Sequence, residues 1–408
     1  MGMSAEQFEP KRVGEVYLPD YSGRSLYNLS HTLLRVFGAP VDQGISGLGD
    51  VLNHSRVVVL LVDGLGHRQL EAAAGRIPAV ASSLSRAKLS LPITSVFPST
   101  TSTVLTTLNT GQVPAKHGVI GFTMYVKELG SVVNSISFSP ASERGEGAFE
   151  RSGLQPSYLY PQRTIYHELS ERGVYTCVVT PNYLANTVLS KTLYNGAERV
   201  RFNQLSDMFV SLRKSLLGRR RDREFYFAYW NGVDTIAHKY GSVSEEYDAE
   251  LNSVFYLLNN ELLERCRGTD TALIITADHG HVYIPQENFH DLSTDTQLLS
   301  ALNVPPTGDS RALFIHPRAG EDVDRVLADR FASTSQIVDS EDALRNNFFG
   351  QTDVEQKIRW RLGQKIVLPY KPHSYVFRYP TYDYKPLLGN HGGLTLDELL
   401  VPLVVYEL

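Results

Sequence analysis

The chain has 408 residues, of which 42% are hydrophobic, 10% aromatic and 20% charged. This is the composition of a globular protein, and it excludes a disordered chain, a collagen-like repeat and a coiled coil. The 39 basic and 44 acidic side chains give a net charge of −5, so the chain as a whole has no attraction for nucleic acid or for an anionic membrane. A phosphate substrate would therefore need positive charge supplied locally.

The N-terminal residues 1–37 are polar and are interrupted by Pro10 and Pro19. They lack the apolar core of a signal peptide, and no stretch of the chain approaches the roughly 18 apolar residues of a membrane span. Cys177 and Cys266 are the only cysteines, too few for a disulfide framework or a thiolate zinc site. We expect a soluble, cytoplasmic protein in which both cysteines are buried.

Strands and helices alternate in the predicted secondary structure. Four short apolar runs, each typical of a strand buried on both faces, lie at residues 57–62, 174–179, 225–229 and 272–276. Helices are predicted at residues 101–110 and 203–217, and a third is predicted after Ser242 as its N-cap. The buried face of this third helix would carry Tyr247, Leu251, Val254, Leu258 and Leu262. The alternation predicts an α/β fold with a mostly parallel central sheet and helices on both faces.

The region 281–386 has a different pattern, with many loop residues between short elements. Its predicted elements are helices at 322–331 and 354–362 and a strand at 365–369. We interpret this region as a small cap inserted into the core. The core would then comprise residues 1–280, with an N-terminal arm at 1–50, and residues 387–408, with a last strand at 399–406.

Acidic and imidazole side chains follow the ends of these predicted strands. They are Asp63, Asp234, His238, Asp278 and His279, together with His391 shortly before the last strand. Because ligands of open parallel sheets bind at the carboxyl ends of the strands, these distant segments can converge. Three carboxylates and three imidazoles suffice for two divalent ions, and the imidazoles favour zinc, with manganese as the alternative.

Each of these segments has an ordinary structural interpretation when taken alone. An Asp after a strand is commonly a turn residue or a helix cap. Gly64 and Gly66 resemble the start of a dinucleotide-binding loop, but the third glycine of that motif is missing. The coincidence of four such segments, each at a strand end, is what favours a metal site.

A hydroxyl-rich segment, Phe-Pro-Ser-Thr-Thr-Ser-Thr at residues 97–103, lies where a loop enters the first predicted helix. Free backbone N–H groups and the helix dipole favour an anion at such a position. A threonine hydroxyl becomes a nucleophile when metal coordination lowers its pKa. The alternative interpretation is an ordinary Ser/Thr helix cap.

Taken together, these residues resemble the alkaline phosphatase superfamily, and within it the type I phosphodiesterase/nucleotide pyrophosphatase family. The matching stretches are VVVLLVDGLG, FPSTTSTVLTTLNTGQVPAKHGVIGF, NGVDTIAHKYG, IITADHG and GNHGGLTLDELLVPLVV, which follow the family's order between residues 57 and 405. The resemblance implies an alkaline-phosphatase-like fold and a metal-dependent hydrolase of phosphate esters.

The resemblance also implies a role for each site residue. The first metal site would consist of Asp234, His238 and His391. The second would consist of Asp63, Asp278 and His279, with Thr101 as both ligand and nucleophile. Thr101 is preferred to Thr100 because the family places the nucleophile three residues after the proline, here Pro98. Two zinc ions and a phosphothreonine-type intermediate are the implied chemistry.

One position departs from the family pattern. Nucleotide pyrophosphatases of this family carry a phosphate-binding Asn four residues beyond the glycine of a His-Gly pair; that glycine is Gly118 here, and the position is Phe122. We predict substrate contacts at Phe122, Thr123, Tyr125 and Lys127. The aromatic side chains of Phe122, Tyr158, Tyr160 and Tyr183 could stack on a nucleobase, with packing as the alternative.

The function predicted from the sequence is that of a phosphodiesterase or nucleotide pyrophosphatase acting on a small phosphate ester or nucleotide. A phosphomonoesterase or a phosphonate hydrolase of the same superfamily is the first alternative. A non-catalytic, metal-containing protein that binds nucleotides is the alternative of another class. No nucleic-acid or membrane partner is indicated, and the oligomeric state is not predicted.

Overall fold

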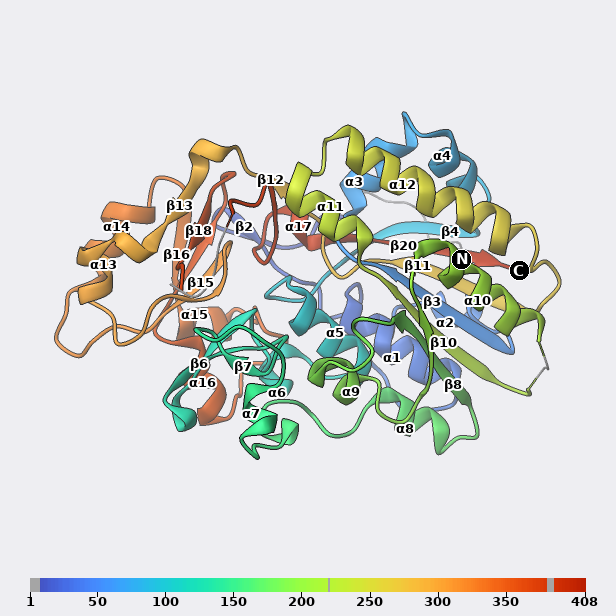
Figure 1. Ribbon diagram of the computed structural model, residues 1–408, viewed down its shortest axis with the longest axis horizontal. Coiled ribbons are helices and arrows are strands. Elements are labelled where there is room, and N and C mark those ends of the chain that lie inside the picture. The colour runs from blue at the N-terminus through green and yellow to red at the C-terminus, as the bar shows by residue number, and fades with distance from the viewer. Residues whose placement is uncertain (1–7, 219–220, 380–384) are drawn as a thin grey trace.

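The computed structural model describes residues 8–218, 221–379 and 385–408. Within these residues the main sheet has seven strands (Figure 1). The strands, in their order across the sheet, are β4 (Leu89–Thr94), β20 (Leu400–Glu407), β11 (Thr271–Thr276), β3 (Arg56–Val62), β10 (Glu224–Trp230), β8 (Tyr175–Pro181) and β9 (Glu198–Phe202).

Parallel pairing dominates the centre of this sheet. Strand β3 pairs in parallel with β10 and β11, and β8 pairs in parallel with β10 and β9. Strand β20 is antiparallel to both β11 and β4. Every residue of β3 and β11 is buried, which is why these strands are continuous apolar runs rather than alternating ones. The predicted fold class is confirmed.

Helices cover both faces of the main sheet (Figure 1). One face carries α3 (His67–Ala74), α4 (Pro78–Leu84), α10 (Leu205–Leu217), α11 (Gly232–Tyr240) and α12 (Glu245–Leu257). The other carries α1 (Leu26–Val36), α5 (Thr101–Thr110), α8 (Ile165–Ser170) and α9 (Val188–Leu193). Helix α1, from the N-terminal arm, is tied to α5 where the Ser30 hydroxyl donates to the carbonyl of Leu108 over 2.9 Å.

The start of α12 differs from the prediction by two residues. Its N-cap is Ser244, whose hydroxyl accepts a hydrogen bond from the backbone N–H of Tyr247 over 3.2 Å; it is not Ser242. Both serines precede acidic residues, so the sequence pattern alone could not choose between them. The predicted apolar face is buried as expected, and the helix continues into a π-helical turn at Leu258–Leu263.

A second sheet, antiparallel throughout, also has seven strands in the described part of the chain, and it lies at the left of Figure 1. Its order is β16 (Ser335–Asp339), β17 (Lys365–Pro369), β15 (Ala312–Ile315), β14 (Thr307–Asp309), β5 (Thr123–Val126), β6 (Ser131–Asn134) and β7 (Ser139–Pro140). Four strands thus come from the region predicted as an insertion, and three come from the predicted core segment. The division into core and cap stays a prediction, and residues 380–384 of the cap lie outside the described residues.

The remaining sequence-based expectations about structure agree with the observed elements. Helices α14 (Val323–Phe331) and α16 (Gln356–Leu362) and strand β17 lie where they were predicted. Cys177 and Cys266 are buried, and burial raises the pKa of each thiol to about 11. Among the described residues, no helix has both the length and the apolar character that a membrane crossing requires.

Candidate metal centre and active site

Two carboxylates lie at the carboxyl ends of neighbouring parallel strands. Asp63 directly follows β3, and Asp278 lies two residues after the end of β11. The backbone N–H of Gly64 donates to Asp278 Oδ1 over 3.1 Å, and the Tyr229 hydroxyl donates to Asp63 Oδ2. Both aspartates are buried. The parallel pairing of β3 with β11 therefore places two acidic side chains together inside the protein.

Helix α11 contributes a third carboxylate and an imidazole. Asp234 and His238 are four residues apart and so lie on the same face of the helix. Asp234 Oδ1 and His238 Nε2 are 3.2 Å apart. The left-handed turn at Gly64 (φ +75°) brings the loop after β3 against this helix, where a Cβ atom would lie 2.9 Å from the Cα of Asp234. Glycine at this position thus permits close contact between the loop that follows Asp63 and the helix that carries Asp234 and His238.

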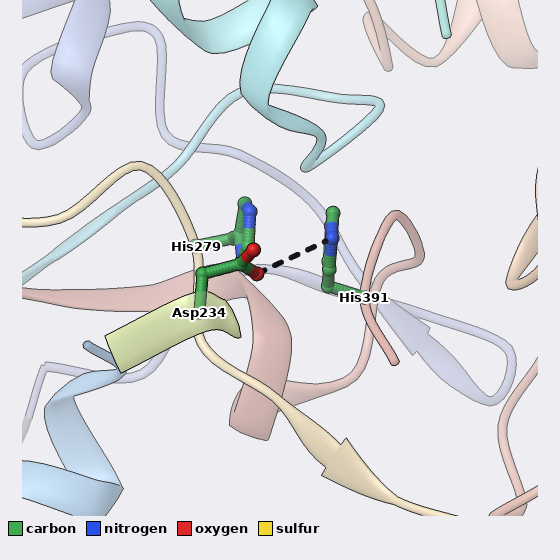
Figure 2. Close-up of side chains that lie close together, drawn as sticks. All are labelled: Asp234, His279 and His391. Atoms are coloured by element: carbon green, nitrogen blue, oxygen red, sulfur yellow. Dashed lines mark ion pairs between the residues drawn. The ribbon is translucent and has the colours of Figure 1, made fainter. Parts of the chain in front are cut away.

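The last predicted ligand, His391, comes from the loop after β19 (Gly389–Asn390). Figure 2 shows its ring facing that of His279, with Asp234 beside them. The two rings are stacked with their centroids 3.5 Å apart, and the dashed line joins Asp234 Oδ1 to His391 Nε2 over 3.8 Å. Segments that are distant in the sequence therefore meet at one place.

The imidazoles of the predicted ligand set are oriented by the backbone. In each, Nδ1 donates to a carbonyl oxygen and Nε2 is directed to the acidic cluster. The acceptors are the carbonyls of Gly389 for His238 (2.7 Å), Gly280 for His279 (3.1 Å) and Ser99 for His391 (3.0 Å). A hydrogen bond of this kind fixes the tautomer whose Nε2 lone pair can bind a metal ion.

Each of the three carboxylates has one buried oxygen without a partner in the described part of the chain. Among the described residues, the buried atoms Asp63 Oδ1, Asp234 Oδ1 and Asp278 Oδ2 have no hydrogen-bond donor. Native proteins rarely leave buried acceptors unpaired unless an ion or water completes them. Groups of three residues place ligand atoms within 4.8 Å of one another: Asp63 with Asp278 and His279, Asp234 with His279 and His391, and Asp234 with His238 and His281. The residues present therefore fit divalent cations.

The electrostatics agree with this interpretation. Burial, together with the charges of Asp278 and Asp234, raises the pKa of Asp63 well above its usual value. Burial and the neighbouring imidazoles of His279 and His238 lower the pKa of His391 well below its usual value. The His391 imidazole is thus neutral at pH 7 with its lone pair available. A bound cation would reverse the carboxylate shift, because it stabilises the ionised form.

Thr101 is the first residue of α5, and its hydroxyl lies 3.3 Å from His279 Nε2. The preceding residue, Thr100, is the N-cap by its backbone conformation, but its side chain does not cap the helix. Instead its hydroxyl donates to Asp309 Oδ1 over 2.9 Å. The ordinary helix-cap interpretation of this segment is therefore wrong for the side chain of Thr100. The N–H groups of the first turn of α5 have no side-chain cap and can receive an anion.

A cavity of about 360 Å³ opens beside Thr101 and the metal-ligand candidates. On one side, helices α5 and α11 and the loop after β19 line it with Thr101, Asp234, His238 and His391. The second sheet and the segment after it line the other side, with residues that include Phe122, Asn134, Asp309, Tyr375 and Phe377. The cavity thus lies between the two sheets.

The predicted substrate residues divide into two pairs. Phe122 and Thr123 line the cavity, and Phe122 is 41% exposed. The Thr123 hydroxyl is already engaged, because it donates to the carbonyl of Gly308 and accepts from its N–H, each over 3.1 Å. Tyr125 and Lys127 are not among the cavity-lining residues that the structure describes. The ring of Tyr125 instead packs against His316, and the Lys127 ammonium lies 4.3 Å from the centre of the Trp360 ring.

The aromatic wall of the cavity was only partly anticipated from the sequence. Of the four aromatic residues proposed to stack on a base, Phe122 alone lines the cavity in the described part of the chain. Tyr160 is buried and donates to the carbonyl of Ser135, and the Tyr183 hydroxyl donates to Asn231 Oδ1 over 2.6 Å. Tyr375 and Phe377 form the wall instead. These two residues are separated by one position, a spacing that is common in strands and does not by itself indicate a functional role.

His281 was also missed. It is fully buried, and its Nε2 lies 3.0 Å from Asp234 Oδ1. Its position two residues after His279, in Asp-His-Gly-His, was the signal that could have identified it.

Comparisons with known proteins bear on these features. The family model of type I phosphodiesterase/nucleotide pyrophosphatase matches residues 57–394. A comparison with curated protein sequences gave no significant match. Among solved structures, murine ectonucleotide pyrophosphatase/phosphodiesterase 5 is 16% identical with a TM-score of 0.61, and the match covers 85% of this chain and 87% of that one. Phosphonoacetate hydrolase from Sinorhizobium meliloti 1021, in complex with phosphonoacetate, is 20% identical with a TM-score of 0.60, covering 85% and 89%.

At these identities the structural matches establish the fold. The family match extends over most of the chain, and it includes every predicted metal ligand and Thr101. The protein therefore belongs to the type I phosphodiesterase/nucleotide pyrophosphatase family of the alkaline phosphatase superfamily, and it is a phosphoester hydrolase.

Proposed function

We propose that this protein hydrolyses a small phosphodiester or nucleotide pyrophosphate with Thr101 as nucleophile and two zinc ions as cofactors. The observation that carries the proposal is the position of the Thr101 hydroxyl. It lies at the first turn of α5, 3.3 Å from His279 Nε2 and in the wall of the cavity that Asp234, His238 and His391 also line. A hydroxyl, candidate ligand atoms and an uncapped helix start thus share one cavity, which supports the proposal.

Two groups of side chains would hold the ions. Asp234, His238 and His391 would hold the first, while Asp63, Asp278, His279 and the Thr101 hydroxyl would hold the second. Divalent cations at these positions would lower the pKa of the Thr101 hydroxyl and offset the charge of the phosphate. The three imidazoles favour zinc over the harder manganese ion.

The proposed reaction has two displacements at phosphorus. In the first, Thr101 Oγ1 forms a bond to phosphorus, the bond from phosphorus to the leaving oxygen breaks, and the leaving oxygen takes up a proton. In the second, a water oxygen forms a bond to phosphorus, the bond to Thr101 Oγ1 breaks, and a proton from that water restores the Thr101 hydroxyl. The N–H groups of the first turn of α5 would bind a non-bridging oxygen in both steps.

Asn134 is the best candidate for the phosphate contact that Phe122 cannot make. Its Oδ1 accepts from the backbone N–H groups of Ile136 (2.9 Å) and Ser137 (3.1 Å), which identifies the other amide atom as nitrogen. No acceptor for that NH₂ group is found among the described residues. The next residue, Ser135, donates to the hydroxyl of Ser102, the neighbour of Thr101, over 2.8 Å. An amide donor in the cavity wall close to the nucleophile can bind a phosphate oxygen.

The apolar part of the cavity favours a substrate with a bulky second substituent. Phe122, Tyr375 and Phe377 offer aromatic surface on which a nucleobase or aryl group could pack. Among the structural relatives, murine ectonucleotide pyrophosphatase/phosphodiesterase 5 has been solved as an inactive variant in complex with AMP. A diester that carries a nucleoside is therefore preferred to a monoester or a phosphonate.

The test is a substrate panel with zinc-loaded protein. The panel contains thymidine 5′-p-nitrophenyl phosphate, bis-p-nitrophenyl phosphate, p-nitrophenyl phosphate and phosphonoacetate. We expect the nucleoside diester to have the highest kcat/KM. Preference for the monoester or for phosphonoacetate would replace the proposal with the corresponding alternative. Zinc binding and nucleotide binding without turnover of any substrate would indicate the non-catalytic protein.

A further inference from the structure

His281 belongs to the histidine cluster but has no role in the ligand set described above. The centre of its ring lies 5.1 Å from the ring centre of His238, 5.4 Å from that of His279 and 5.3 Å from that of His391. The side chain is fully buried, with Nε2 3.0 Å from Asp234 Oδ1. A buried imidazole at this distance from a metal-ligand candidate needs a physical explanation.

The contact between His281 and Asp234 does not have the geometry of a hydrogen bond. Both ring nitrogens of His281, and Asp234 Oδ1, lack hydrogen-bond partners among the residues that the structure describes. The same oxygen lies 3.2 Å from His238 Nε2 and 3.8 Å from His391 Nε2. Three imidazole nitrogens therefore converge on one carboxylate oxygen, and none of them has the geometry of a hydrogen bond to it. A cation bound among them would satisfy all four atoms.

The backbone makes room for this ring on two sides. A Cβ atom at Gly64 would lie 2.6 Å from His281 Nε2, and one at Gly389 would lie 3.1 Å from its Nδ1. The Gln69 side chain donates to the carbonyl of His281 over 2.7 Å, which holds the backbone in place. The ring is thus fitted between two glycines with Nε2 near Asp234.

His281 reaches the cluster from outside the substrate cavity. The cavity beside Thr101 is lined by Asp234, His238 and His391 but, in the described part of the chain, not by His281. His281 instead lines a second cavity of about 460 Å³, together with Gln69 and Tyr283. A ligand in this position would leave the substrate-facing side of the first ion open.

We propose that His281 Nε2 is a fourth protein ligand of the first metal ion, in addition to Asp234, His238 and His391. The inference rests on the proposed function for the presence of that ion. With His281, the first ion would have four carboxylate and imidazole ligands, whereas the second would have three and the weaker hydroxyl of Thr101, so the first ion would be bound more tightly. The second ion, held by Asp63, Asp278 and His279, then exchanges first.

The direct test uses the wild-type protein loaded with ¹¹³Cd and labelled with ¹⁵N at histidine. Of the 12 histidines, we expect four to show one-bond coupling between Nε2 and cadmium: His238, His281, His391 and His279. Coupling on the other three without His281 would overturn the inference and leave the proposed function intact. Absence of coupling on every histidine would overturn both.

A second test measures metal affinity. His281→Leu should lose one zinc ion at a chelator concentration at which the wild type retains both, with an affinity at least ~10-fold weaker at the first site. His316→Leu removes a buried imidazole that lies outside the cavity and should retain both ions. His281→Gln keeps a polar side chain and serves where the Leu variant does not fold. Unchanged zinc affinity in a folded His281 variant would overturn the inference.

Discussion

Arg311 and Glu398 form a fully buried ion pair with two parallel hydrogen bonds, from Nε to Oε2 over 2.8 Å and from Nη2 to Oε1 over 3.0 Å. Glu398 Oε2 also accepts from the backbone N–H of Gly393 over 3.2 Å, and the carbonyl of Gly393 accepts from the Ser99 hydroxyl over 2.8 Å. The pair thus ties the second sheet to the loop of His391 and to the segment that carries Thr101.

Removal of one partner of this pair should destabilise the protein strongly. Arg311→Met leaves the Glu398 carboxylate buried without its partner, and we expect a loss of about 3–5 kcal/mol in the free energy of unfolding. Urea unfolding followed by circular dichroism measures it. The double variant Arg311→Met, Glu398→Gln should recover part of the loss. A single variant within about 0.5 kcal/mol of the wild type would show that the pair is not what joins these segments.

The hydroxyl of Thr101 should be indispensable for turnover. Thr101→Ala removes the proposed nucleophile while leaving Asp63, Asp278 and His279 to bind the second ion. We expect kcat to fall by about 10³-fold or more, with zinc content unchanged by elemental analysis. Thr101→Ser keeps a hydroxyl and should retain measurable activity. Equal turnover by the alanine variant would remove Thr101 as the nucleophile.

The carboxamide of Asn134 should contribute to kcat/KM through its NH₂ group. Asn134→Asp keeps the oxygen that accepts from Ile136 and Ser137 but replaces the donor by a second acceptor. We expect a decrease of about 10²-fold in kcat/KM with little change in stability. Asn346→Asp, at an exposed position, controls for the added charge. Full activity in the Asn134→Asp variant would mean that another group binds the phosphate.

His391 should hold one of the two ions. His391→Ala removes a ligand of the first site, so we expect elemental analysis to find one zinc per chain instead of two at the same free zinc concentration. Turnover should fall by about 10- to 100-fold or more. His316→Ala, which removes an imidazole outside the cavity, should keep both ions. An unchanged zinc content in the His391 variant would contradict the ligand assignment.

Asp309 should make stability depend on pH. Burial raises the pKa of its carboxyl from 3.8 to about 7. The folded state therefore holds this proton more tightly than the unfolded state. The protonated carboxyl thus contributes most to the free energy of unfolding at low pH, and this contribution is lost as the pH rises to about 7. At about 1.4 kcal/mol per pH unit, the stability of the wild type relative to Asp309→Asn should fall by about 3 kcal/mol between pH 5 and pH 8.

The measurement compares urea unfolding of the two proteins in the presence of a chelator, so that metal binding, which depends on pH, does not contribute. The titration of the metal-free ligand residues is common to both proteins and cancels in the difference. A difference in stability that does not change with pH would show that the Asp309 carboxyl is ionised throughout.

The local parts of the fold and site were predictable from sequence. Strand β3 is a continuous apolar run that ends at Asp63, and Asp234 and His238 have helical spacing on α11. Such patterns depend on neighbours in the chain, and parallel strands bring their carboxyl ends to one edge. The zinc ions and the cytoplasmic location remain predictions.

The second sheet and the cavity wall were not predictable in the same way. Strand β14 pairs with β5 through Gly308 and Thr123, which are 185 residues apart. Short antiparallel strands of this kind carry little periodicity, and their partners depend on packing rather than on local pattern. Tyr125 and Lys127 were therefore assigned to the substrate although both side chains pack elsewhere.

The cavity between the two sheets separates two tasks. The helices and loops that follow the strands of the main sheet carry Thr101 and the metal-ligand candidates. The aromatic wall comes from Phe122, next to strand β5 of the second sheet, and from Tyr375 and Phe377 in the segment after that sheet. Under the proposed function, substitutions of these aromatic residues would alter which leaving group is accepted while the proposed nucleophile and metal ligands stay in place. In this architecture substrate preference can diverge among relatives without any change in the bond-breaking chemistry.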